Sequence, residues 1–188
     1  MDAQQVVQIV AGGLAVLCVV IIILRRKRKK TQVKTTSRCM SEEPSINPEY
    51  AAFKLRLGRS RIHRWGIYAA ENIPARRKVM EYIGERISRR ETKRRSSERE
   101  LHYLFTLDNY WTIDGSVGGS GAEYINHSCE PNLVSRIVKG HILYLSRRRI
   151  KKGEELTIDY NFSPDVERVP CACGSSGCRG TINLKIRQ

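Results

Sequence analysis

YINHSCEPN at 124–132 and GEELTIDYNF at 153–162 are the stretches that decide the fold, and CACGSSGC follows them at 171–178. A fourth stretch, IHRWG at 62–66, precedes all three. These segments contain amide, imidazole, phenol and thiol side chains, which can bind ligands or metals. Their identity and their order along the chain are the main guide to both fold and function.

Short runs rich in Ile, Val, Tyr and Trp surround these stretches, and most are bounded by Gly, Pro, Asn or Asp. The runs are IHRWGIYAA (62–70), KVMEYIGE (78–85), YLFTLD (103–108), YWTIDG (110–115), HILYLS (141–146) and ELTIDY (155–160). They predict a mostly β protein. One helix is expected at 87–104, where acidic and basic residues are interleaved and apolar residues are sparse, as in a solvated helix.

NHSCEPN, the later ELTIDY and the terminal C-x-C-x4-C resemble, in this order, the SET-domain lysine methyltransferases with a post-SET cysteine module. The similarity covers roughly residues 57–186. It implies the SET-domain fold, a set of small β-sheets with a knot-like C-terminal threading. S-adenosylmethionine and a target lysine of a protein substrate would then enter from opposite faces. The strand order lacks alternating βαβ units and a GxGxxG motif, which argues against a Rossmann-type methyltransferase.

The resemblance also assigns cofactor-binding residues. They are His63, Arg64, Trp65 and Gly66 in the cofactor loop, together with Tyr103, Asn126 and His127. Three positions depart from the family pattern: Arg64 replaces the first glycine of a G-x-G loop, Ser120 stands where Asn is usual, and Glu123 where Arg is usual.

Tyr160 aligns with the family's catalytic tyrosine, and Tyr103 with a tyrosine that lines the lysine channel. Tyr82, Phe105 and Ile158 are expected in the channel wall, with aromatic core as the alternative for Tyr82 and Phe105. The amine must be neutral to accept a methyl group, and a lysine with a pKa of about 10.4 pays roughly 4.6 kcal/mol for deprotonation at pH 7. A dry channel beside a sulfonium lowers that cost without a strong base. Ile158, which has no hydroxyl to restrict methylation, predicts that more than one methyl group is added.

Cys171, Cys173 and Cys178 form a C-x-C-x4-C motif, and the family takes a fourth ligand from the NHSC cysteine, here Cys129. Four thiolates around a tetrahedral zinc leave no open position, so the expected site is structural. Disulfides are the alternative, although a reducing compartment disfavours them.

A run of nineteen residues at 6–24 contains Gln8 as its only strongly polar side chain, and RRKRKK follows at 25–30. As a helix the run would span roughly 28 Å, close to the hydrocarbon core of a bilayer. A cleaved signal peptide or a buried core helix are the alternatives, but the charges follow the apolar run instead of preceding it. The positive-inside rule places the N-terminus outside and the catalytic domain on the cytoplasmic face. The basic block either binds anionic lipid or serves only to orient the helix.

The expected organisation is a short extracytoplasmic N-terminus at 1–5, a transmembrane helix at 6–24, a basic linker at 25–50, a SET domain at 51–163 and a zinc-binding tail at 164–188. The net charge of +15 is partly explained by the basic block, and no nucleic-acid-binding motif is visible, so nucleic acid is not expected as a direct ligand. No obligate oligomer is expected. The rival reading is a catalytically inactive SET module that acts as a membrane-tethered binding or scaffold protein.

Overall fold

Short strands dominate the computed structural model, which describes residues 44–99 and 103–185. The strands are β1 Leu55–Arg59, β2 Trp65–Ala69, β3 Lys78–Tyr82, β4 Glu85–Ser88, β5 Leu104–Thr106, β6 Trp111–Asp114, β7 Asn126–His127, β8 Leu133–Val138, β9 His141–Ser146 and β10 Thr157–Ile158. The helical elements are α1 Arg89–Glu98 and two 3₁₀ turns, η1 Pro48–Tyr50 and η2 Ala122–Tyr124. The prediction of a mostly β protein is confirmed.

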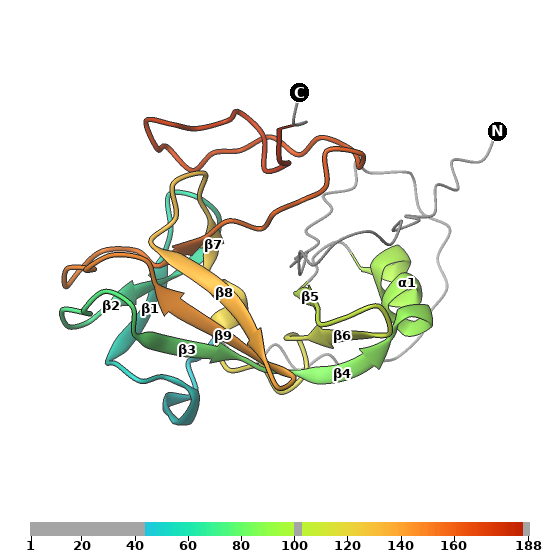
Figure 1. The fold of residues 1–188 in the computed structure, drawn as a ribbon, viewed down its shortest axis with the longest axis horizontal. Coiled ribbons are helices and arrows are strands. Elements are labelled where there is room, and N and C mark those ends of the chain that lie inside the picture. Colours follow the sequence, from blue (N-terminus) through green and yellow to red (C-terminus); the bar gives the residue numbers. More distant parts are fainter. Residues whose placement is uncertain (1–43, 100–102, 186–188) are drawn as a thin grey trace.

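Within the described residues the strands form four small sheets. Antiparallel pairing builds β1-β2, β3-β9-β8 and β4-β6-β5, whereas β10 pairs with β7 in parallel. Figure 1 shows α1 and the β4-β6-β5 sheet at one end of the molecule, with the C-terminal segment in red passing above β7. The parallel pair places Thr157 beside Asn126 and Ile158 beside His127. It therefore joins the two stretches that the sequence singled out, although about thirty residues separate them.

A continuous apolar core joins the sheets. Ile67 of β2, Met80 of β3 and Ile150 are fully buried in it. The rings of Tyr82 and Phe105 lie 5.3 Å apart in the same core, which links the β3-β9-β8 sheet to the β4-β6-β5 sheet. Burial of such large side chains stabilises a fold by roughly 1.5–3 kcal/mol each.

Helix α1 is shorter than the sequence predicted. Ser88 caps it by accepting a hydrogen bond from the Glu91 amide at 3.3 Å, and the helix ends at Glu98. The expectation of helix to residue 104 was wrong, because Leu104 lies in β5 and is buried where that strand pairs with β6. The prediction of a solvated helix holds for most of α1, whereas Thr92 and Arg95 are buried.

Strands β1, β7 and β8 lie outside the predicted runs, and β4 includes two residues that were expected in the helix. The described part of the chain also contributes to the core before residue 50. Ile46 packs against the core, and the Asn47 amide donates to the carbonyl of Ser120 at 2.9 Å. The predicted transmembrane helix at 6–24 and the basic block at 25–30 lie outside the described residues. Across 44–99 and 103–185, no helix has the length and apolarity needed to cross a bilayer.

Candidate active site and metal centre

Four separate segments converge on one small cavity. Its lining consists of His63, Arg64, Trp65, Tyr103, Glu123, Tyr124, Asn126 and Tyr160. The segments are the loop before β2, the residue before β5, η2 with β7, and the residue two positions after β10. Six of the predicted site residues therefore meet at this cavity, and Tyr124 is a lining residue that sequence reasoning missed.

Asn126 holds the loop before β2 against the parallel strand pair. Its side-chain amide donates to the Trp65 carbonyl and to the Glu155 carboxylate, both at 2.8 Å, and lies 3.3 Å from the His63 carbonyl. A side chain at Gly66 would overlap the Glu155 carboxylate. Asn126 thus fixes the backbone of the predicted cofactor loop, and Gly66 leaves room for the Glu155 carboxylate beside it.

Arg64 adopts a backbone conformation that glycine favours. Its φ is 40°, in the left-handed region that costs other residues roughly 1–2 kcal/mol. This position therefore keeps the backbone expected of the family's glycine while adding a guanidinium to the cavity lining.

Tyr160 is buried with its hydroxyl directed back into the protein. The hydroxyl donates to the Ile125 carbonyl at 3.0 Å, and the Tyr160 amide donates to Nδ1 of His127 at 3.2 Å. Burial raises the pKa of Tyr160 well above its ordinary value and raises the pKa of Tyr103 to about 12. Both phenols are therefore neutral near pH 7, and neither is a strong base.

His127 connects Tyr160 to the cysteine cluster. Because its Nδ1 accepts from the Tyr160 amide, the ring proton resides on Nε2, which lies 3.4 Å from Sγ of Cys129. Burial lowers the pKa of His127 to about 4, so the neutral ring donates one hydrogen bond to the cysteine. The side chain of His127 does not line the cavity. A cofactor contact by the backbone of His127 stays a prediction.

Cys129, Cys171, Cys173 and Cys178 form one cluster, in which the sulfur atoms all lie within 4.8 Å of one another. The Sγ atoms of Cys129 and Cys171 are 3.8 Å apart. Four sulfurs at about 2.3 Å from a tetrahedral zinc would be about 3.8 Å apart, so the spacing fits this metal. None of the four forms a disulfide. All four predicted ligands are brought together.

Tyr82, Phe105 and Ile158 lie behind the cavity, in the core. Tyr82 is 2% exposed, and its hydroxyl donates to the Tyr103 carbonyl at 2.6 Å. Phe105 and Ile158 are 1% and 3% exposed. Their predicted contact with the target lysine stays a prediction, whereas Tyr82 contacts Tyr103 and Ile158 pairs with His127 directly.

The departures at 120 and 123 have different consequences. Ser120 is fully buried, and its hydroxyl donates to the Glu81 carbonyl at 2.6 Å, which is a structural contact. Glu123 instead faces the cavity and accepts a hydrogen bond from the Gly121 amide at 2.8 Å. Burial raises its pKa from 4.5 to about 7, despite that hydrogen bond.

The cavity offers charged and aromatic side chains that suit S-adenosylmethionine. Arg64 and Glu123 provide one cation and one carboxyl for the two charged ends of an amino-acid group. Trp65, Tyr103 and Tyr124 provide aromatic faces, which attract cations such as a sulfonium.

Glu123 makes stability depend on pH. Between pH 4.5 and about 7 the folded chain binds more protons than the unfolded chain, so stability falls as pH rises. Without added cofactor, Glu123→Gln is expected to raise the free energy of unfolding by about 3 kcal/mol at pH 8 and to leave it unchanged at pH 4. Urea titrations at both pH values measure this. Glu167→Gln, at an exposed position, is the control. An equal change at both pH values would contradict the assignment.

Comparison with known proteins gives a consistent family match. Residues 64–161 match the SET domain. A protein named histone-lysine N-methyltransferase, H3 lysine-4 specific, from Schizosaccharomyces pombe is 41% identical over 139 residues, covering 69% of this chain and 15% of that protein. Its namesake from Aspergillus oryzae is 40% identical over 141 residues, covering 69% and 12%. Histone-lysine N-methyltransferase trithorax of Drosophila virilis is 41% identical over 133 residues, covering 66% and 4%. The chain thus spans a small part of the length of these relatives.

Proposed function

Because the chain belongs to the SET-domain family of lysine methyltransferases, we propose that it transfers a methyl group from S-adenosylmethionine to the side-chain amine of a protein lysine. The observation that carries the proposal is the meeting of Tyr103, Asn126 and Tyr160 with the loop before β2 at one cavity. The names of the relatives make a peptide around lysine 4 of histone H3 the first substrate to test.

The residues of the cavity suit this reaction. The bound cofactor supplies an electrophilic methyl group on a sulfonium. The lysine nitrogen contributes the lone pair for the new carbon–nitrogen bond, the sulfur keeps the electrons of the broken bond, and the ammonium proton goes to solvent beforehand. Burial keeps Tyr103 and Tyr160 neutral, so neither phenol supplies an anion that would hold the ammonium, and removal from water beside them favours the neutral amine.

The test combines cofactor binding with methyl transfer by the full chain. We expect calorimetric binding of S-adenosylmethionine and incorporation of labelled methyl into the histone H3 peptide, but not into the same peptide with lysine 4 replaced by arginine. Binding without transfer to this peptide or to a lysine-rich protein mixture would favour the inactive scaffold module. Absence of binding by a folded chain would refute the proposal.

Ile158 predicts the number of methyl groups. It lies in β10 beside His127, and it has no hydroxyl to hold a water molecule near the amine. We expect dimethyl or trimethyl product under exhaustive conditions, and Ile158→Tyr is expected to shift the product toward monomethyl. Mass spectrometry of the peptide distinguishes them. Monomethyl product alone from the unchanged chain would contradict the prediction.

We further propose that the chain is anchored in a membrane by residues 6–24, with the SET domain on the cytoplasmic face. The support is the apolar run and the basic block directly after it. The full chain is expected in the membrane fraction after alkaline extraction, with its C-terminus accessible to protease outside sealed inside-out vesicles. Deletion of 6–24 should release it. Extraction of the full chain at alkaline pH would refute the anchor.

A further inference from the structure

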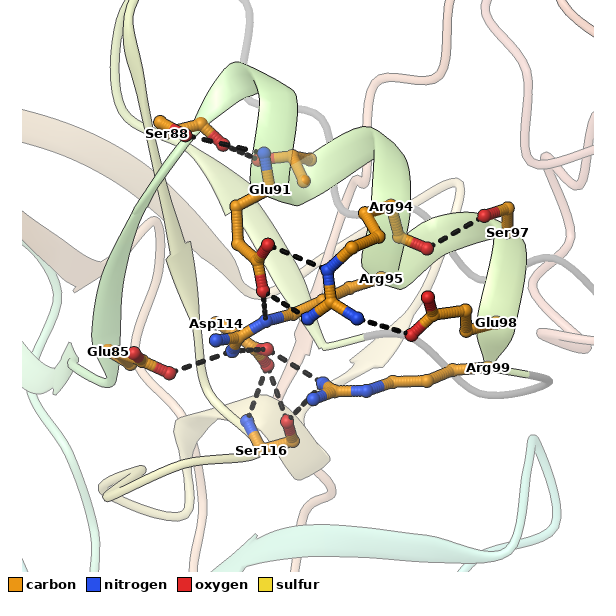
Figure 2. A network of polar contacts seen from close by, with 11 residues as sticks. Glu85, Ser88, Glu91, Arg94, Arg95, Ser97, Glu98, Arg99, Asp114 and Ser116 are labelled. Atoms are coloured by element: carbon orange, nitrogen blue, oxygen red, sulfur yellow. Dashed lines mark hydrogen bonds and ion pairs between the residues drawn. The ribbon is translucent and has the colours of Figure 1, made fainter. Parts of the chain in front are cut away.

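A buried ion network joins α1 to the end of β6 (Figure 2). Asp114 is fully buried, and one of its carboxylate oxygens accepts from Arg95 at 2.6 Å and from Arg99 at 2.7 Å. Its other oxygen accepts from the amide and the hydroxyl of Ser116, at 3.0 and 2.5 Å. Arg99 also donates to the Ser116 hydroxyl at 2.8 Å. Two guanidinium groups from one helix end thus converge on a single carboxylate.

Two further carboxylates, nearer the surface, also belong to the network. Arg95 forms ion pairs with Glu85 at 2.8 Å and with Glu91 at 2.7 Å, so its charge is shared among three carboxylates. Burial alone would raise the pKa of Asp114, but hydrogen bonds from Ser116 and Arg95 hold it below its usual range. Asp114 therefore remains charged, and the geometry of both arginines depends on it.

Asp114 directly precedes Gly115, whose amide forms a hydrogen bond with the backbone of Tyr103. The amide of Gly115 donates to the Tyr103 carbonyl at 2.7 Å, and the Tyr82 hydroxyl donates to the same carbonyl at 2.6 Å. Gly115 has no room for a side chain, because a Cβ there would meet the Tyr82 hydroxyl at 2.7 Å. The position of Tyr103 is consequently set by the backbone directly after Asp114.

Two described residues close to Tyr103 in the sequence also contact Asp114. Arg99 is four residues before Tyr103, and Leu104, directly after Tyr103, pairs with Asp114 in the β5-β6 register. Asp114 therefore contacts a described residue on each side of Tyr103 in the sequence, Arg99 through its carboxylate and Leu104 through backbone pairing. The Tyr103 ring then packs edge-on against Tyr124 at 5.6 Å, and both rings line the cavity.

We propose that Asp114, with Arg95 and Arg99, is a positioning device that fixes Tyr103 in the cofactor cavity through the backbone at the end of β6. The proposal rests on the proposed function, in which Tyr103 lines the reaction channel. It makes Asp114 a positioning residue, because it touches neither cofactor nor substrate. It also makes α1 part of the active-site architecture, since α1 supplies Arg95 and Arg99 directly follows it.

The decisive variant is Asp114→Asn in the full chain, which keeps the shape and removes the charge. Glu98→Gln is the matched control, because Glu98 pairs with Arg94 on the exposed side of the same helix. We expect Asp114→Asn to lower kcat by about 10- to 100-fold while KM for the peptide changes by less than about threefold. Hydrogen exchange of the Gly115 amide, read by fragmentation mass spectrometry, should accelerate in Asp114→Asn and not in Glu98→Gln.

A second variant separates positioning from loss of stability. Asp114→Asn combined with Arg99→Gln removes the uncompensated cation, so stability should recover while kcat stays low. Recovery of kcat together with stability would overturn the proposal, as would unchanged Gly115 exchange in Asp114→Asn. If the unchanged chain transfers no methyl group, the proposed function fails on its own. Accelerated Gly115 exchange would then still support the anchoring of Tyr103, and unchanged exchange would overturn it.

Discussion

Tyr160→Phe is expected to lower kcat for methyl transfer by on the order of 100-fold, the size of effect seen when one preorganised polar group is removed from a dry active site. The phenol hydroxyl is the only group lost, and Phe keeps the ring that stacks on Phe162 at 6.1 Å. The change also leaves the Ile125 carbonyl without the hydroxyl that donates to it at 3.0 Å. Both consequences act at the cavity, because Tyr160 lines it.

Single-turnover transfer from labelled S-adenosylmethionine measures the rate, and calorimetry measures cofactor affinity in the same preparations. We expect the affinity to change by less than about threefold, since the lost group acts on transfer more than on binding. Tyr110→Phe, which removes a hydroxyl from a side chain that is 75% exposed, is the control. Full activity of Tyr160→Phe would remove Tyr160 from the mechanism. Parallel loss of affinity and rate would make it a residue that shapes the cavity.

Motif order was enough to predict which distant segments meet. Asn126 and Tyr160 come from stretches that pair in parallel through β7 and β10, and no local propensity predicts such a pair of two-residue strands. The family resemblance supplied that contact. The same holds for Cys129, whose partners lie more than forty residues later in the sequence.

Other parts could not be predicted, for identifiable reasons. Strand β8 alternates buried and exposed positions only partially, with polar Ser135 and exposed Arg136 adjacent in its middle, so its period is weak. In the sequence, Arg95 resembles the other charged residues of a helix that has no clear apolar face. Nothing in the sequence of α1 reveals that a buried carboxylate lies opposite it. Glu123 was visible as a departure from the family, but its raised pKa depends on burial that only the fold creates.

Cys173→Ser is expected to abolish zinc binding and methyl transfer while the core stays folded. The unchanged chain should contain about one zinc ion, since four thiolates complete a structural site. Cys129 is the only ligand of the cluster outside the C-terminal segment, and the Arg179 amide, 3.4 Å from its Sγ, also lies in that segment. Losing the metal therefore removes the tie between the segment and the end of β7, while Val166, Val169 and Ile182 of the segment still pack against the apolar core.

Three measurements separate these consequences. Elemental mass spectrometry gives the zinc content, circular dichroism reports on the folded core, and hydrogen exchange reports on 164–185. We expect less than about 0.1 zinc per chain in Cys173→Ser, because three remaining thiolates bind the ion far more weakly than four. Exchange should accelerate in 164–185 and stay unchanged in β3 and β9. Ser176→Ala, which removes an exposed hydroxyl from the same loop, should keep its zinc. Retention of a full equivalent of zinc with normal transfer by Cys173→Ser would refute the site, since Cys173 would then not be a ligand. Global unfolding on metal loss would instead show that the C-terminal segment supports the core as well as the cavity.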